Sequence, residues 1–269
     1  MSTLASPNPS LEFLKLLGHD VRWQLLAALA QSDRRVQELV ALLQRPQNLI
    51  SYHLRLLRDG RIVHERRSSA DGRDIYYSLD LNQLRNLYLE SGQALHPALA
   101  GTGVQQEIEI DGESKEQPMS EALLQKRPHR VLFLCTHNSA RSQLAEGILR
   151  VQGGDSVEVF SAGSEPSKVH PLAIKAAVAL NIDLAGQHSK HMDEFNGQTF
   201  DIVITVCDKV REICPVFPVE TRQIHWSFPD PAAVTDSEQQ QYQAFLQTAR
   251  ELSTRIGYLL LMIERQKSQ

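Results

Sequence analysis

The stretch Val131-Leu-Phe-Leu-Cys135-Thr-His-Asn-Ser-Ala-Arg141-Ser142 decides the fold of the second half of this 269-residue chain. It begins with a short apolar run, which is typical of a buried parallel strand. The segment that follows, Gln143–Arg150, has apolar residues at helical spacing. Cys135 is therefore predicted at the end of a strand, and Arg141 at the beginning of a helix.

The loop between these two elements predicts a site for a tetrahedral oxyanion. Its backbone N–H groups have no ladder partner and can turn inward, and the helix N-terminus adds partial positive charge. Arg141 can hold two oxygens in bidentate fashion. The positive charge of the helix N-terminus and of Arg141 also favours a thiolate over a thiol, so we expect Cys135 to be a nucleophile with a lowered pKa. The alternative is a buried strand-end cysteine followed by an ordinary helix cap. The predicted substrate-binding residues are Thr136, His137, Asn138, Ser139, Ala140, Arg141 and Ser142.

From His129 onward, predicted strands and helices alternate, which indicates an α/β domain with a parallel four-stranded sheet and helices on both faces. In such sheets ligands bind beyond the carboxyl ends of the strands. The predicted strands are 130–135, 157–161, 200–207 and 223–228, and the predicted helices are 140–151, 171–180 and 237–266.

Three chemically versatile side chains fall at that one edge of the sheet, namely Cys135, Cys207 and Asp230. Cys214 follows Cys207 by seven positions across the polar segment 208–213, which we read as a turn short enough to bring the two sulfurs together. A carboxylic acid at position 230 can protonate a departing oxygen. The alternatives are strand cysteines that act as small hydrophobic residues and an Asp-Pro that only forms a turn.

Residues 129–265 resemble the low-molecular-weight protein tyrosine phosphatase fold, whose phosphate loop the Cys-x5-Arg-Ser pattern from Cys135 to Ser142 matches. The thioredoxin-coupled arsenate reductases share that loop. The pair Cys207 and Cys214 resembles their resolving cysteines. At the position of Ala232 the phosphatases usually carry an aromatic residue, whereas the reductases carry an alanine, as this chain does.

The resemblance implies an arsenate reductase that binds no cofactor and takes electrons from thioredoxin or a similar external dithiol. Arsenate would be the substrate, and arsenite the product of a three-cysteine disulfide relay. The catalytic residues that it implies are Cys135, Arg141, Cys207, Cys214 and Asp230.

Some reductases of this kind bind potassium beside the loop. The matching residues in this chain are Asn138, Glu146, Ser161 and Ser189. His191 stands where a carboxylate is expected, so we expect Lys190 and His191 to supply positive charge in place of the ion.

The first hundred residues read as three helices, a basic hairpin and a fourth helix, the order of an α+β winged helix-turn-helix. The predicted helices are 11–30, 36–43, 47–58 and 82–99, and the predicted strands are 61–67 and 74–79. Side chains of the third helix can reach base edges, and arginines of the hairpin can meet phosphates. The alternative is a small helical domain with a solvated basic face. The predicted DNA contacts are Gln47, Asn48, Ser51, Tyr52, Arg55, Arg66, Arg67 and Arg73.

This region is similar to the ArsR-type repressors, notably in Ser51-Tyr-His-Leu-Arg-Leu-Leu-Arg-Asp-Gly60 and Tyr76-Tyr-Ser-Leu79. The resemblance implies a double-stranded DNA operator and a homodimer that pairs through the helix 82–99 and the first helix. Many of those repressors carry a cysteine pair on the second helix, but Arg34–Leu39 contains no thiol. His96 stands alone on the last helix, so we do not expect direct metal sensing by this region.

We predict two domains, residues 1–100 and 128–269, joined by an acidic linker over 101–127. No apolar run approaches the roughly 20 residues that span a bilayer, and no secretory signal is apparent, so we expect the cytoplasm and no membrane. The three cysteines do not indicate a structural disulfide framework. The leading hypothesis is an arsenic-responsive repressor fused to an arsenate reductase. The alternatives are a tyrosine phosphatase with a DNA-binding domain and a repressor that senses oxyanions or redox state without catalysis.

Overall fold

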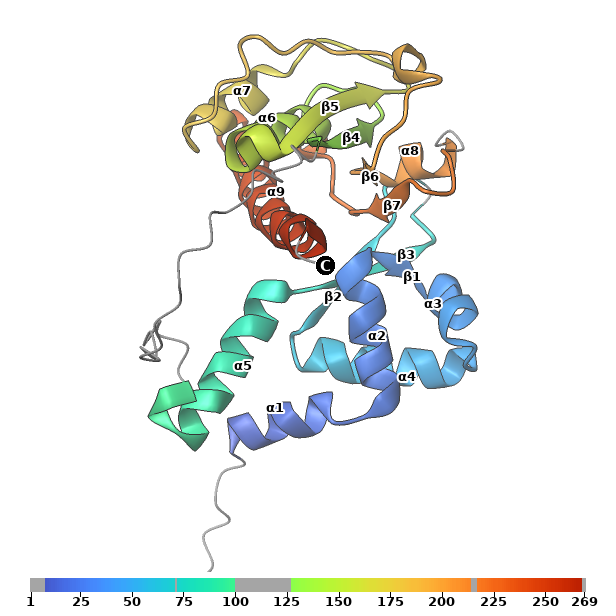
Figure 1. The fold of residues 1–269 in the computed structure, drawn as a ribbon, viewed down its shortest axis with the longest axis vertical. Helices are drawn as coiled ribbons and strands as arrows, with labels where there is room; N and C mark the ends of the chain where they lie inside the picture. Colours follow the sequence, from blue (N-terminus) through green and yellow to red (C-terminus); the bar gives the residue numbers. More distant parts are fainter. Residues whose placement is uncertain (1–7, 71, 100–126, 214–216, 268–269) are drawn as a thin grey trace, which may run out of the picture.

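The computed structural model describes residues 8–70, 72–99, 127–213 and 217–267, and these ranges form two separate hydrophobic cores. The predicted linker, apart from its last residue, lies outside the described residues, as does Cys214. Figure 1 shows the helical part of the chain on one side and the parallel sheet on the other.

The N-terminal core is built from helices that pack around Leu25, Leu39 and Leu54, each fully buried. A single helix was predicted over 11–30, but the structure has two. Gly18 ends the first, and His19 caps the second by accepting a hydrogen bond from the Val21 N–H. The helices are α1 (Pro9–Leu17), α2 (Asp20–Gln31), α3 (Val36–Leu43), α4 (Gln47–Asp59) and α5 (Leu81–Leu95), and a 3-10 turn, Pro97–Leu99, follows the last.

The predicted hairpin is present as β2 (Val63–Arg67) and β3 (Ile75–Leu79), paired antiparallel with Val63 opposite Leu79. A two-residue strand that the sequence analysis missed, β1 (Arg34–Arg35), pairs with the other side of β3. The hairpin therefore forms a three-stranded sheet in the order β1-β3-β2, with α4 and the hairpin placed as in a winged helix-turn-helix.

The second core surrounds a parallel sheet in the order β5-β4-β6-β7, which confirms the predicted four-stranded α/β architecture. Strand β4 is central and almost entirely buried, as its apolar run predicts. The strands are β4 (His129–Cys135), β5 (Val157–Gly163), β6 (Ile202–Thr205) and β7 (Arg222–His225). The α-helices are α6 (Arg141–Gly153), α7 (Pro171–Val178), α8 (Asp208–Ile213) and α9 (Glu238–Lys267), and 3-10 turns occur at Gly154–Ser156, Met192–Phe195 and Pro231–Ala233.

One element of this domain differs from the prediction in kind. The segment 208–213 was expected to be a turn, but it forms the helix α8, which begins directly after Cys207. Its residues Asp208 and Val210 are buried, so this short helix is anchored by its own side chains. In the part of the chain that the structure describes, no helix is both long and apolar enough to cross a membrane.

Candidate functional site

The loop between β4 and α6 is held from outside through its carbonyl groups. Those of Thr136, His137 and Ser139 accept hydrogen bonds from the N–H groups of Glu165, Ser167 and His170, at 2.9, 3.0 and 2.9 Å. The Asn138 carbonyl accepts from the Ser189 hydroxyl at 2.7 Å and from the Gln143 amide at 3.0 Å. Because these carbonyls point outward, the N–H groups of the loop are left to face its interior, as an oxyanion site requires.

Gly163, at the end of the neighbouring strand β5, lets the loop come this close. A Cβ placed there would lie 2.5 Å from the Thr136 carbonyl oxygen and 2.8 Å from the Asn138 nitrogen, closer than real contacts allow. Asn138 itself has a positive φ of 44°, which tightens the turn above the sulfur.

Cys135 lies at the base of the loop with 2% of its surface exposed. Its Sγ accepts a hydrogen bond from the Asn138 backbone N–H at 3.2 Å and lies 2.8 Å from the Ser142 Oγ. Both groups are placed to stabilise a negative sulfur.

A chain of hydrogen bonds fixes which way the Ser142 hydroxyl points. The Lys190 N–H donates to Asn138 Oδ1 at 2.8 Å, so Asn138 Nδ2 faces the other way and donates to Ser142 Oγ at 2.9 Å. Nδ2 also donates to Ser161 Oγ, which in turn donates to Glu146 Oε2 at 2.5 Å. Since Ser142 Oγ already accepts this bond, its own hydrogen is available for the Cys135 sulfur.

The residues expected around a potassium ion meet in this network, but their charges do not fit the ion. Glu146 is buried and already pairs with Arg150, and its Oε2 lies 3.5 Å from Lys190 Nζ. Two cationic side chains therefore already neutralise the only carboxylate in the set. His191 uses Nε2 to contact the Ser164 carbonyl at 2.9 Å, away from Glu146. Lys190 thus lies where it can supply positive charge to this network, while the His191 ring contacts Ser164 and Asp193. No three His, Cys, Asp or Glu side chains of the described ranges form a group that could hold a metal.

Arg141 and Asp230 form an ion pair beside the loop. Arg141 Nη2 lies 3.2 Å from Asp230 Oδ2, and Arg141 Nη1 donates to the Phe228 carbonyl at 3.2 Å. Asp230 also caps the 3-10 turn Pro231–Ala233 by accepting a hydrogen bond from the Ala232 N–H at 3.1 Å. The structure thus brings together the arginine and the carboxyl group that lie 89 positions apart in the sequence.

The expectation of a lowered pKa at Cys135 is wrong for this structure. Burial raises the pKa of the thiol, and this effect exceeds the opposing effects of the Arg141 charge and the Ser142 hydrogen bond. The sequence motif contains the groups that stabilise a thiolate, but it does not reveal how deeply the sulfur is buried.

Cys207 lies beside the same loop, with 1% of its surface exposed. Its Sγ is 3.3 Å from the Thr136 Oγ1, so a second buried thiol contacts the residue next to Cys135. The structure therefore brings together four of the five predicted catalytic residues around one loop, and the fifth, Cys214, lies outside the described residues.

Most of the predicted DNA-contacting side chains are on the surface. Gln47, Asn48, Tyr52 and Arg55 of α4 are exposed, as are Arg67 and Arg73 of the hairpin, and Ser51 is half-buried. Arg66 is different, because its guanidinium is turned toward the α/β domain and pairs with Asp208 at 2.7 Å. A phosphate contact by Arg66 would require that pair to break.

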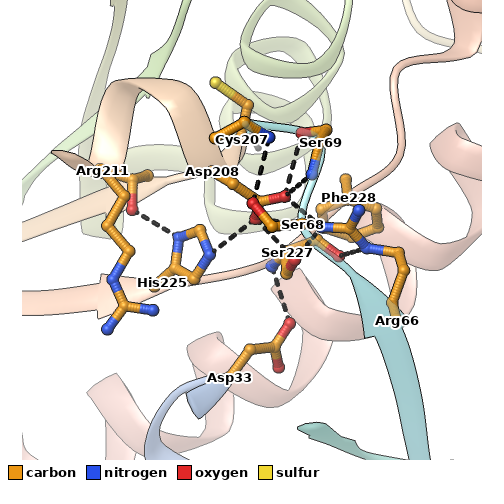
Figure 2. Close-up of polar contacts among 12 residues, drawn as sticks. Asp33, Arg66, Ser68, Ser69, Cys207, Asp208, Arg211, His225, Ser227 and Phe228 are labelled. Atoms are coloured by element: carbon orange, nitrogen blue, oxygen red, sulfur yellow. Dashed lines mark hydrogen bonds and ion pairs between the residues drawn. The ribbon is translucent and has the colours of Figure 1, made fainter. Parts of the chain in front are cut away.

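Asp208 is the centre of a polar network that sequence reasoning missed (Figure 2). Besides Arg66, it accepts hydrogen bonds from the Ser69 N–H at 2.7 Å, the Ser69 Oγ at 2.9 Å and the Ser227 Oγ at 2.6 Å, and it lies 3.1 Å from His225 Nε2. Burial alone would raise its pKa, but the bonds from His225, Ser227 and Ser69 and the charge of Arg66 outweigh burial and hold that pKa well below its usual range. The only signal in the sequence was an acidic residue directly after a strand-end cysteine.

Ser32 and Asp33 hold the two domains together at β7, the edge strand of the parallel sheet. The Asp33 N–H donates to the His225 carbonyl at 2.8 Å, and the His225 N–H donates to Ser32 Oγ at 2.9 Å. Asp33 Oδ2 accepts from the Ser227 N–H at 2.7 Å, and Arg255 of α9 pairs with the same carboxylate at 3.0 Å. These contacts satisfy polar backbone groups that an edge strand would otherwise present to solvent.

Comparison with known proteins agrees with this geometry. Residues 130–269, more than half of the chain, match the low molecular weight phosphotyrosine protein phosphatase family, and residues 19–65 match the bacterial regulatory protein, arsR family. The arsenate reductase of Halalkalibacterium halodurans is 37% identical over 126 residues, which are 47% of this chain and 91% of that protein. The arsenate reductase of Bacillus subtilis is 36% identical over 126 residues, which are also 47% of this chain and 91% of that protein.

Among solved structures, an arsenate reductase in the phosphate-binding state is 32% identical, with a TM-score of 0.42 over 50% of this chain and 98% of that one. A thioredoxin-dependent arsenate reductase of Corynebacterium glutamicum is 30% identical, with a TM-score of 0.43 over 54% of this chain and 65% of that one. The chain thus belongs to the low molecular weight phosphotyrosine protein phosphatase family, is related within it to bacterial proteins named arsenate reductase, and joins this domain to an ArsR-family helix-turn-helix.

Proposed function

We propose that residues 128–269 reduce arsenate to arsenite with electrons from thioredoxin or a similar dithiol, and that residues 1–100 are a DNA-binding repressor domain. The observation that carries the enzymatic part is the meeting of two buried thiols at one oxyanion loop, with Cys207 in contact with Thr136 next to Cys135. A phosphatase needs only the first thiol, whereas a reductase needs a second thiol to take up the oxidation.

In the first step the Cys135 sulfur, as a thiolate, attacks the arsenic of arsenate held by the loop N–H groups and Arg141. An As–S bond forms, and one arsenate oxygen departs as water after Asp230 protonates it. The hydrogen bonds from the Asn138 N–H and from Ser142 stabilise the thiolate and counteract part of the effect of burial, which raises the Cys135 pKa. Residues 136–142 bind the oxyanion in this mechanism.

In the second step the Cys207 thiolate attacks the Cys135 sulfur. The S–As bond breaks, its electron pair reduces arsenic from the pentavalent to the trivalent state, and arsenite leaves with a Cys135–Cys207 disulfide behind. Cys214 then attacks Cys207 and releases Cys135 as a thiolate, and an external dithiol reduces the Cys207–Cys214 disulfide. The two electrons come from thiols, so the mechanism uses no bound cofactor.

The competing enzymatic hypothesis is a tyrosine phosphatase. Ala232 argues against it, because a methyl group does not line a slot for a phenol ring, and Ala232 packs against the core instead. We expect purified protein with thioredoxin, thioredoxin reductase and NADPH to produce arsenite and oxidise NADPH when arsenate is added. Hydrolysis of aryl phosphate without arsenite production would support the phosphatase, and no turnover of either substrate would support a non-catalytic sensor.

Replacing Cys214 by serine is expected to allow about one turnover and then stop the enzyme. The first two steps need only Cys135 and Cys207, but regeneration needs a disulfide that an external dithiol can reach. Rapid-quench measurement of arsenite should show a burst of about one equivalent per chain, and peptide mapping should find the Cys135–Cys207 disulfide. Multiple turnover at the wild-type rate would show that Cys214 plays no part in the relay.

The DNA-binding part of the proposal rests on α4, whose exposed Gln47, Asn48, Tyr52 and Arg55 form one polar surface, with Ser51 half-buried among them. Arg67 and Arg73 of the hairpin would contact phosphates, and Arg66 could do so only after leaving Asp208.

Apolar side chains of α1, α5 and the 3-10 turn after α5 are exposed, and α1 packs on α5, which supports a homodimer through these helices. These apolar residues are Leu11, Leu14, Tyr88, Leu95 and Leu99. Such a repressor and a thioredoxin-coupled enzyme would work in the cytoplasm.

Residues 1–100 alone are expected to form a dimer that binds DNA and does not respond to arsenite. Trivalent arsenic prefers sulfur ligands, and this region contains no cysteine. Any arsenic response of the full chain would then come through Cys135, Cys207 and Cys214. Gel-shift titration of both proteins, reduced and oxidised, measures this difference, and affinity should fall steeply with salt. Release of DNA by the isolated domain on addition of arsenite would contradict the argument from absent thiols.

A further inference from the structure

The side chain of Asp208 connects the β2–β3 hairpin, which is the wing of the DNA-binding domain, to the segment that carries Cys207. It is the first residue of α8, it directly follows Cys207, and its side chain is fully buried. Two of its partners, Arg66 and Ser69, belong to the β2–β3 hairpin, which reaches the α/β domain at β7 and α8 (Figure 1). A carboxylate buried in this way is stable only while its hydrogen bonds and charge partner are present.

A second contact fixes the other end of α8. Arg211 pairs with Glu38 of α3, and its guanidinium carbon lies 5.1 Å from the centre of the Tyr76 ring of β3. The N-terminal domain therefore contacts α8 at both Asp208 and Arg211, one helical turn apart. These contacts support the helical conformation of the segment that begins after Cys207.

The helical conformation of α8 and a disulfide between the cysteines that flank it in the sequence place opposite demands on the length of this segment. Its six residues span about 9 Å along the helix axis, at about 1.5 Å per residue. A disulfide requires the two Cα atoms to lie within about 7 Å of each other. We therefore expect α8 to unwind when a Cys207–Cys214 disulfide forms, and the unwound segment to lose its present contacts at Asp208 or Arg211.

We propose that Arg66 and Ser69 of the DNA-binding wing are positioning residues for the thiol relay, which hold α8 and Cys207 in the reduced arrangement and are released when the Cys207–Cys214 disulfide forms. This inference rests on the relay proposed above. In that step the Cys214 thiolate forms a bond to the Cys207 sulfur, the Cys135–Cys207 bond breaks, and Cys135 leaves as a thiolate. The wing is thereby attached in one redox state and detached in the other.

The contacts between the wing and Asp208 belong to the dithiol form of Cys207 and Cys214, and this determines which redox form they stabilise. The Arg66–Asp208 pair exists with α8 folded, so it stabilises the dithiol form relative to the disulfide form. Removing the pair favours the disulfide, and by linkage the disulfide weakens docking of the wing to the same extent. Because Arg66 would leave Asp208 to contact a phosphate, DNA and the reduced α8 compete for the same side chain.

The test is a thiol–disulfide equilibrium measured in the full chain with Cys135→Ser, where Cys207 and Cys214 are the two remaining cysteines. The protein is equilibrated in dithiothreitol buffers of graded redox state, and alkylation followed by mass spectrometry gives the oxidised fraction. Arg66→Met is compared with Arg67→Met, the next residue of the same strand, which is exposed and donates only to the Gly72 carbonyl among the contacts described. Arg66→Lys tests whether a cation alone restores the effect.

We expect Arg66→Met to shift the equilibrium toward the disulfide about tenfold, which is about 30 mV for a two-electron couple. Arg66→Lys should shift it less, and Arg67→Met less than about twofold. Hydrogen exchange should show the Ser69 amide protected in the dithiol form and exposed in the disulfide form. If Arg66→Met does not fold, Ser69→Ala, which removes one hydrogen bond to Asp208 and keeps the N–H donor, should give a smaller shift of the same sign.

These measurements distinguish a failure of the proposed coupling between the wing and α8 from a failure of the proposed cysteine relay. If the disulfide forms but Arg66→Met leaves the equilibrium unchanged, or shifts it toward the dithiol, the coupling is wrong and the relay stands. If Cys207 and Cys214 form no disulfide in any buffer, the relay fails and the coupling fails with it. An unchanged Ser69 exchange rate on oxidation would also overturn the coupling.

Discussion

Replacement of Cys135 by serine should lower arsenate reduction by about 10⁴-fold or more, the scale on which covalent catalysts lose activity without their nucleophile. In the described residues this sulfur is the one inside the oxyanion loop, where it meets the Asn138 N–H and the Ser142 hydroxyl. A serine hydroxyl fits the same space, but it is not ionised near neutral pH and cannot pass electrons to arsenic. The thermal midpoint should move by only a few degrees, since the size and polarity of the side chain change little.

The comparison to make is with Cys207→Ser. That variant retains the nucleophile and should still form the arsenate adduct, but it should release no arsenite. Steady-state arsenite formation measures both variants, and mass spectrometry of the intact protein detects the adduct. Residual activity of more than a few per cent in Cys135→Ser would rule out Cys135 as the nucleophile.

Replacement of Asp208 by alanine should destabilise the folded chain by roughly 3–5 kcal/mol, the range for removing one partner of a buried charged network. The substitution removes the carboxylate that contacts Arg66, Ser69, Ser227 and His225, and it leaves these polar groups around a cavity between the two domains. Asp201 provides the matched control. It pairs with Arg127 near the surface and lies within the α/β domain, so Asp201→Ala should cost much less. Urea unfolding of both variants gives the comparison, and a loss at Asp208 no larger than at Asp201 would contradict the central place given to this network.

The same network sets the direction of the pH dependence. Burial lowers the pKa of His225 in the folded chain, so the unfolded chain binds that proton more readily and stability falls as the pH drops below about 6.5. The pKa of Asp208 is also below its unfolded value, so its contribution is complete above about pH 4 and is lost on further acidification. Below about pH 4, Asp208→Ala should therefore show a shallower loss of stability than the wild type, whereas the loss that comes from His225 remains, because Asp208 raises the His225 pKa.

The sequence predicted the parts of the site that follow from local pattern. An apolar run followed by Cys-x5-Arg placed Cys135 and Arg141 correctly, and strand ends on a common sheet edge placed Cys207 and Asp230 near them. The outer hydrogen bonds from Glu165, Ser167 and His170 could not be predicted, because they depend on how a distant loop folds back over residues 136–139.

The domain interface escaped prediction for a related reason. Ser32, Asp33 and Asp208 look like ordinary polar residues in the sequence, and only the packing of the wing on β7 and α8 makes them interior groups. For the same reason Arg66 resembled its neighbour Arg67, although the pleat of β2 turns the two side chains to opposite sides. The helix α8 was read as a turn because six polar and apolar residues give too short a pattern to distinguish the two.

The most direct test of the proposed mechanism is a single turnover without any external thiol. Fully reduced protein, freed of reductant, is mixed with excess arsenate, and arsenite and disulfides are quantified together. The relay predicts about one equivalent of arsenite per chain, no further turnover, and a Cys207–Cys214 disulfide with Cys135 returned to the free thiol. Arsenite formed without that disulfide, or the disulfide formed equally without arsenate, would contradict it.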